Sequence, residues 1–77
     1  MKINIELMGS LVDYLPETDR GQSVLNLKDE STIADLLNYL KIKRRVIVAV
    51  NGDEEKGLEH VLSDGDDVLI FTVISGG

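Results

Sequence analysis

The two residues with the clearest capacity for chemistry are Gly76 and Gly77, the last in the sequence. A terminal carboxylate can be activated, capped with sulfur or joined to an amine. Because glycine has no Cβ, such an end can adopt backbone angles closed to other residues and enter a narrow cleft in another protein. We expect a flexible diglycine tail over about residues 75–77. The simpler alternative is a frayed end without a function, since chain ends are commonly disordered.

A strand must deliver this tail, and the run Val68–Ile74 predicts one. The run is apolar and rich in β-branched residues, as strands are. The preceding Asp64-Gly65-Asp66 predicts the turn that leads into it. The tail is therefore expected to begin close to the end of a buried strand.

The N-terminal part of the chain predicts two strands joined by a long loop. Apolar and polar residues alternate over Ile3–Leu7, so one face of a first strand should lie on the core. Alternation resumes over Ser23–Lys28, which predicts a second strand paired with the first. The connection Ser10–Gly21 is irregular and predicts a loop, within which Leu11–Leu15 could form a helical turn.

A helix is predicted to begin at Ser31 or Thr32, because either side chain can cap free backbone N–H groups. Asp35 lies three residues after Thr32, where a carboxylate favours the positive end of a helix. The apolar residues that follow recur at spacings of three and four, so one side of the helix must pack on the sheet. These residues are Ile33, Leu36, Leu37 and Leu40.

Four cations gather where this helix should end, namely Lys41, Lys43, Arg44 and Arg45. Cations in the last turn complement the negative end of a helix, which is the structural interpretation. The functional alternative is that they dock on an acidic patch of a partner or on a substrate phosphate. The sequence leaves both interpretations open.

The segment after the helix predicts an interior strand followed by turns. Val46–Val50 is apolar on both faces, as a strand covered on each side would be. Asn51-Gly52 follows as a tight turn. Farther on, Leu58, Val61 and Leu62 predict a short turn packed against the core.

This order of elements predicts one α+β domain over residues 1–77, with a mixed sheet of four to five strands and one main helix on one face. The first and last strands should lie side by side and parallel in the middle of the sheet. That arrangement is the β-grasp, or ubiquitin-like, fold.

A single helix can cover only one face of the sheet, which leaves an apolar set without cover. We expect Val46, Val48, Val50, Val68 and Ile70 to face the helix. The other set should face outward and form a partner-docking surface with Phe71 as its anchor. The alternatives are cover by the loop 10–21 or by a second copy of the chain. The outward set is Ile47, Ala49, Leu69, Phe71 and Val73.

Composition narrows the function classes. The formal charge of −6 disfavours binding to nucleic acid, and it could steer the protein to a basic partner. No cysteine is present and no apolar run approaches the length of a membrane span, so we expect a cytoplasmic protein without membrane contact. His60 is the only histidine and has no second metal ligand at a suitable spacing. We find no convergent catalytic set, and so expect neither an enzyme nor a bound cofactor or metal.

Several segments together resemble the ubiquitin-like sulfur carriers, which include the small subunit of molybdopterin synthase and the thiamine-pathway sulfur carrier. The segments are Thr32–Leu37, Val50–Gly52, Asp64–Val68 and the final Gly76-Gly77. The segment Gly9–Pro16 is similar to the longer first loop of molybdopterin synthase small subunits. The ending differs, because those carriers often have prolines where Thr72 and Val73 stand here.

The resemblance implies a function for the tail. In that family, an adenylating enzyme of the ubiquitin-activating type uses ATP and magnesium to activate the terminal carboxylate, and sulfur is then installed as a thiocarboxylate. Gly77 would hold the sulfur, and Gly76 would keep the tail slim. The implied partners are this enzyme and the large catalytic subunit of molybdopterin synthase or an equivalent acceptor. Molybdenum or tungsten cofactor synthesis is expected, with the thiamine pathway or conjugation to protein lysines as alternatives.

Overall fold

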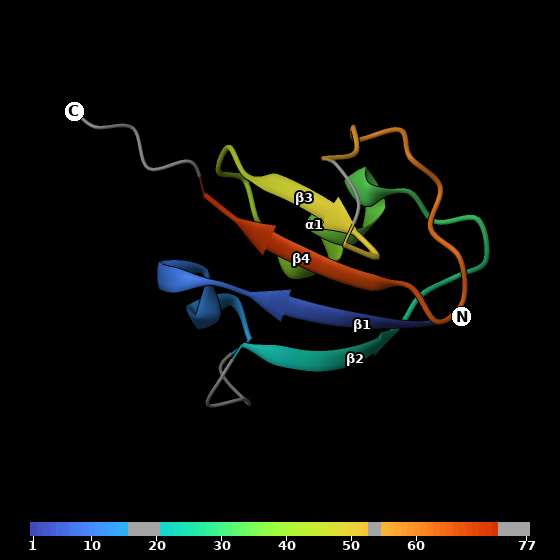
Figure 1. Cartoon of the computed structure of the whole chain (residues 1–77), viewed down its shortest axis with the longest axis horizontal. Helices are drawn as coiled ribbons and strands as arrows, with labels where there is room; N and C mark the ends of the chain where they lie inside the picture. Colours follow the sequence, from blue (N-terminus) through green and yellow to red (C-terminus); the bar gives the residue numbers. More distant parts are fainter. Residues whose placement is uncertain (16–20, 53–54, 73–77) are drawn as a thin grey trace.

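One mixed sheet with an α-helix on one face makes up the described part of the chain, as the computed structural model shows (Figure 1). The structure describes residues 1–15, 21–52 and 55–72. The strands in these ranges are β1 (Lys2–Leu7), β2 (Gln22–Asn26), β3 (Ile47–Val50) and β4 (Asp67–Phe71), and the helices are the 3-10 helix η1 (Gly9–Tyr14) and α1 (Ile33–Leu40).

The strand order is β2-β1-β4-β3, and the two central strands are parallel. β1 and β4 pair from Asn4 with Asp67 to Leu7 with Ile70. β2 is antiparallel to β1, and β3 is antiparallel to β4. This topology confirms the β-grasp prediction, including the central position of the first and last strands.

α1 begins with a capping box, as its sequence predicts. The Asp35 backbone N–H donates to Thr32 Oγ1 at 3.2 Å, and the Thr32 N–H donates to Asp35 Oδ2 at 2.9 Å. Two of the free N–H groups at the start of the helix are therefore satisfied. The helix ends at Leu40, and Lys41 follows in the left-handed conformation with φ of 61°.

The core lies between α1 and the covered face of the sheet. α1 contributes its predicted apolar stripe, all four residues of which are buried. β3 and β4 contribute Val48, Val50, Val68 and Ile70, as predicted, whereas Val46 precedes β3 and is only partly buried. β1 adds Ile3, Ile5 and Leu7. Alternation along each strand thus decides which residues the helix covers.

The segment 58–62 corrects one sequence-based expectation. Leu62 is buried, but Leu58 and Val61 are 57% and 51% exposed. The backbone of this segment pairs with the start of α1, since Ala34 N–H donates to Leu58 O. Val61 forms an isolated bridge with Thr32, so its side chain points away from the neighbouring inward Leu62.

Two predicted strands also have shifted boundaries. The second strand ends at Asn26 instead of Lys28, and the last strand covers Asp67–Phe71 instead of Val68–Ile74. Thr72 follows β4 without belonging to it, and Val73 and Ile74 lie outside the described residues.

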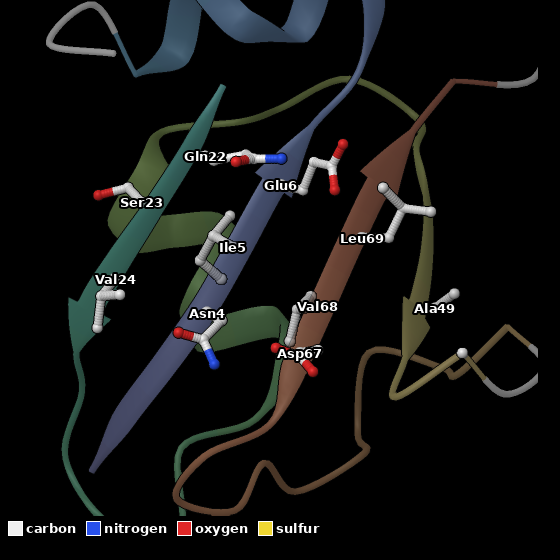
Figure 2. A pocket seen from close by; sticks show the side chains of 11 residues that line it. Asn4, Ile5, Glu6, Gln22, Ser23, Val24, Ala49, Asp67, Val68 and Leu69 are labelled. Atoms are coloured by element: carbon white, nitrogen blue, oxygen red, sulfur yellow. The ribbon is translucent and has the colours of Figure 1, made fainter. Parts of the chain in front are cut away.

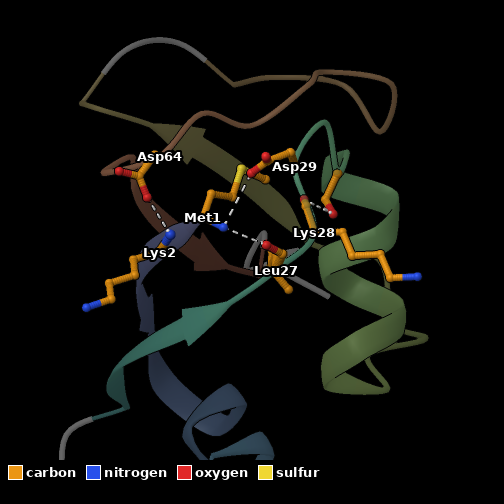
Figure 3. A network of polar contacts seen from close by, with 7 residues as sticks. Met1, Lys2, Leu27, Lys28, Asp29 and Asp64 are labelled. Carbon is orange, nitrogen blue, oxygen red and sulfur yellow. Dashed lines mark hydrogen bonds and ion pairs between the residues drawn. The ribbon is translucent and has the colours of Figure 1, made fainter.

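Polar contacts fasten the start of β1 to two loops (Figure 3). The Met1 amino group donates to Leu27 O at 2.8 Å, and the Lys2 N–H donates to Asp64 Oδ1 at 2.6 Å. The Met1 nitrogen also lies 3.5 Å from Asp29 Oδ1, but the Asp29 side chain is 91% exposed. Such an exposed ion pair contributes little, so the hydrogen bonds to Leu27 and Asp64 hold this end of the sheet.

Candidate docking surface and C-terminal end of the sheet

Four apolar residues lie on the face of the sheet that α1 leaves open. Ile47 pairs with Phe71, and Ala49 pairs with Leu69, so two cross-strand pairs lie next to one another. All four side chains are partly buried, while the residues between them along each strand are buried under α1. We call these four residues the open-face patch. Val73, the fifth residue of the predicted surface, lies outside the described residues.

A shallow hollow of about 560 Å³ continues this patch across the open face (Figure 2). Ala49 and Leu69 line it from β3 and β4, and β1 and β2 contribute both polar residues and the apolar Ile5 and Val24. Figure 2 shows Glu6 on β1 beside Leu69 on β4, with Gln22 on the far side of β1. The open face therefore carries the apolar patch over β3 and the end of β4, whereas β1 and β2 contribute mainly polar residues together with the exposed Val24.

The polar residues of β1 on this face were absent from the sequence-based site, although the signal for them exists. Asn4 and Glu6 alternate with the buried residues of β1, so they must face away from α1. The register of β1 with β4 places Glu6 opposite Leu69. Period-two alternation could have identified both residues once the strand order was assumed.

β4 ends next to two other segments. The Met8 N–H donates to Ile70 O at 3.1 Å, which joins the end of β1 to the end of β4. η1 begins at Gly9, so it lies at the same end of the sheet (Figure 1). Residues 73–77 continue the chain from here. The two residues expected to do chemistry, Gly76 and Gly77, lie outside the described residues.

The basic cluster is also located at this end. Arg45 precedes Ile47 by two residues, and Ile47 pairs with Phe71 at the end of β4. Arg44 Nη1 donates to Ser10 Oγ in η1 at 3.1 Å. Lys43, Arg44 and Arg45 are exposed, and we call these three residues the basic segment.

The described residues contain no group of three or more histidines, cysteines or carboxylates that could hold a metal ion. In the same ranges, no helix is long and apolar enough to cross a membrane. His60 contributes backbone contacts to the fold, because its carbonyl accepts a hydrogen bond from Ile33 N–H at 3.0 Å.

Solved structures of other proteins share this fold. A putative molybdopterin converting factor subunit 1 from Pyrococcus furiosus superposes with a TM-score of 0.79 at 19% identity, covering 96% of this chain and 99% of that chain. Small archaeal modifier protein 1 from H. volcanii gives a TM-score of 0.76 at 16% identity, covering 95% and 98%. A chain of the complex of subunits 1 and 2 of molybdopterin-converting factor from Helicobacter pylori gives a TM-score of 0.64 at 18% identity, covering 100% of both chains. The fold is thus that of the ubiquitin-like β-grasp proteins.

The family of the protein is identified from its amino-acid sequence. The model of the ThiS family matches residues 5–77, so the chain belongs to the ThiS family. This result confirms the predicted membership of the ubiquitin-like sulfur carriers. No curated protein matches the chain.

Proposed function

We propose that this protein carries sulfur on its C-terminus, with the Gly77 carboxylate converted to a thiocarboxylate. The observation that supports this proposal is the family match, which extends through Gly76 and Gly77. The end of β4 adds a physical argument. The chain leaves the sheet beside the open-face patch, so a partner that docks on the patch is close to the start of the tail.

The proposed chemistry takes place in a partner enzyme that uses ATP and magnesium. A Gly77 carboxylate oxygen attacks the α-phosphorus of ATP, and the bond to pyrophosphate breaks. The acyl-adenylate then has AMP as a good leaving group, which an unactivated carboxylate lacks. Hydrosulfide, supplied by a sulfur donor, attacks the acyl carbon, the bond from that carbon to AMP breaks, and the resulting thiocarboxylic acid loses a proton to become the thiocarboxylate. The carrier contributes no catalytic side chain, and Gly76 keeps the approach to Gly77 narrow.

The proposed pathway is synthesis of the molybdenum or tungsten cofactor. Two structural neighbours are described as components of molybdopterin converting factor, and one of them was solved as a complex of two subunits. By analogy, we propose a large catalytic subunit as the acceptor partner. The thiamine pathway is the alternative that the family name favours.

A second function of a different class is conjugation to proteins, in which Gly77 forms an isopeptide bond with lysine. The structural similarity to a protein described as a small archaeal modifier favours this second function. Mass spectrometry of the protein isolated from its host separates the two functions. Exchange of one oxygen for sulfur at the terminus supports the carrier, whereas branched glycine–lysine peptides alone would reject the carrier in favour of the modifier.

Changing Phe71 to aspartate is expected to weaken binding to the adenylating enzyme by about 30-fold or more. Phe71 is the largest side chain of the open-face patch, and truncating such an anchor commonly costs roughly 2 kcal/mol or more. A charge at the centre of an apolar contact adds a desolvation cost. Calorimetric titration of the enzyme with wild-type and variant carrier measures the change.

The matched control is Tyr39→Asp, which makes the same chemical change at an aromatic residue 58% exposed on α1. It lies across the molecule from the open face, so its affinity should stay within about twofold of wild type. Urea unfolding must show that both variants remain folded. Equal affinities for the Phe71 and Tyr39 variants would place the docking surface elsewhere.

A further inference from the structure

The basic segment has no structural role as a helix cap. α1 has no basic residue in its last turn, and Lys43, Arg44 and Arg45 come three to five residues after Leu40. The attraction of cations to a helix end falls off within the last turn. The sequence left open whether these cations stabilise the helix end or dock on an anionic partner. For these three residues, the docking interpretation therefore gains support.

The three cations are also without ion-pair partners in the described ranges. Arg44 contacts the neutral Ser10 hydroxyl, and no ion pair involves any of the three within the part of the chain that the structure describes. The protein has 8 cations against 14 acidic residues, so three adjacent exposed cations without an acidic partner depart from its overall charge. Such a group repels itself and attracts an anionic ligand.

A hollow of about 340 Å³ is lined by the basic segment, by the exposed Asn38 and by five apolar residues. Exposed Leu58 is part of its lining, which gives a role to a side chain that the core does not use. The site thus joins an apolar floor to a cationic rim. The apolar lining residues are Ala34, Leu37, Ile42, Val46 and Leu58.

The shape of this site favours a peptide over a single phosphate. Consecutive Cα atoms are about 3.8 Å apart, so cations on three successive non-helical residues are spread along the chain instead of converging on one point. A phosphate group would make little use of the apolar floor. A segment that carries both carboxylates and an apolar side chain would use the rim and the floor together.

We propose that the basic segment and its hollow bind an acidic, partly apolar segment of the partner that receives the tail. Arg45 lies two residues from Ile47, so this site adjoins the open-face patch where β4 ends. A partner could contact both surfaces at once and hold the carrier in one orientation. The identity of the partner in this proposal rests on the proposed function. The chemistry of the site does not depend on that function.

The test compares two variants with the same change in charge. Lys43→Glu/Arg45→Glu reverses two cations of the site and leaves the Arg44–Ser10 contact intact. Lys2→Glu/Lys28→Glu reverses two exposed cations on β1 and the loop after β2. NMR titration of the full chain with a synthetic peptide of alternating glutamate and leucine should shift amides of residues 42–46 and of Leu58. Sodium pyrophosphate serves as the comparison anion.

The peptide should bind the site variant roughly five- to tenfold more weakly than wild type, and the control variant within about twofold. Added salt should weaken binding to wild type. The proposal is overturned if the peptide leaves these amides unshifted, if both variants lose affinity equally, or if pyrophosphate binds the site more tightly. Because the titration needs no activation of Gly77, its result is independent of whether a thiocarboxylate forms.

Discussion

A single alanine added after Gly77 should abolish thiocarboxylate formation without changing the fold. The addition moves the carboxylate by one residue and places a Cβ next to it, where the proposed reaction requires a slim end. A displacement of the reacting group by even about 1 Å can cost about a hundredfold in rate. Pyrophosphate release in the presence of the adenylating enzyme and ATP measures activation, and intact mass measures sulfur incorporation.

The control keeps the length and the two glycines but changes the residue before them, as in Ser75→Ala. This variant should accept sulfur at a rate close to that of wild type. If the extended protein still performed its cellular role, neither sulfur transfer nor conjugation through Gly77 could be that role. The protein would then be a β-grasp interaction module that is never activated.

Replacing Gly21 by alanine is expected to lower the free energy of unfolding by about 3 kcal/mol. Gly21 has φ of 67°, a region in which a side chain is strained. A Cβ here would overlap the Leu7 carbonyl oxygen and would lie 2.8 Å from Val12 Cγ1. The Leu7 oxygen cannot move freely, because the Leu7 N–H is held by the Gly21 carbonyl at 2.7 Å. Urea unfolding measures the loss.

The variant Gly9→Ala distinguishes the cost of backbone strain from the cost of steric overlap. Gly9 has a similar φ of 60°, but a Cβ there would meet nothing within 4 Å. This variant should therefore lose only the conformational contribution, about 1 kcal/mol. A loss at Gly21 no larger than the loss at Gly9 would mean that the loop before β2 adjusts to the added carbon without cost.

Local patterns were sufficient for the elements and for the covered face of the sheet. The capping box at Thr32 and Asp35 depends on residues three apart, which the sequence displays directly. Alternation over Val46–Val50 and Val68–Phe71 separated Val48 and Ile70, which are buried, from Ile47 and Leu69, which are not. The docking role of the open-face patch stays a prediction.

Features that depend on distant residues were not accessible in the same way. The exposure of Leu58 and Val61 follows from pairing of their backbone with the start of α1, which lies far away in the sequence. The contact of Arg44 with Ser10 spans 34 residues. Periodicity also does not give the order of strands; the central, parallel pair was inferred from the order of the elements along the chain. A one-residue change in register would have reversed every assignment of faces.

The parallel pairing of β1 and β4 has a mechanical consequence if, as we propose, a partner enzyme holds the C-terminus. The two strands run in the same direction, so the start of β1 and the end of β4 lie at opposite ends of the sheet. Force applied between the two ends of the chain would pull these strands along their length in shear. Their hydrogen bonds would then share the load and break together instead of one after another. An enzyme that pulls on the tail would therefore act on a domain that resists unfolding in this direction.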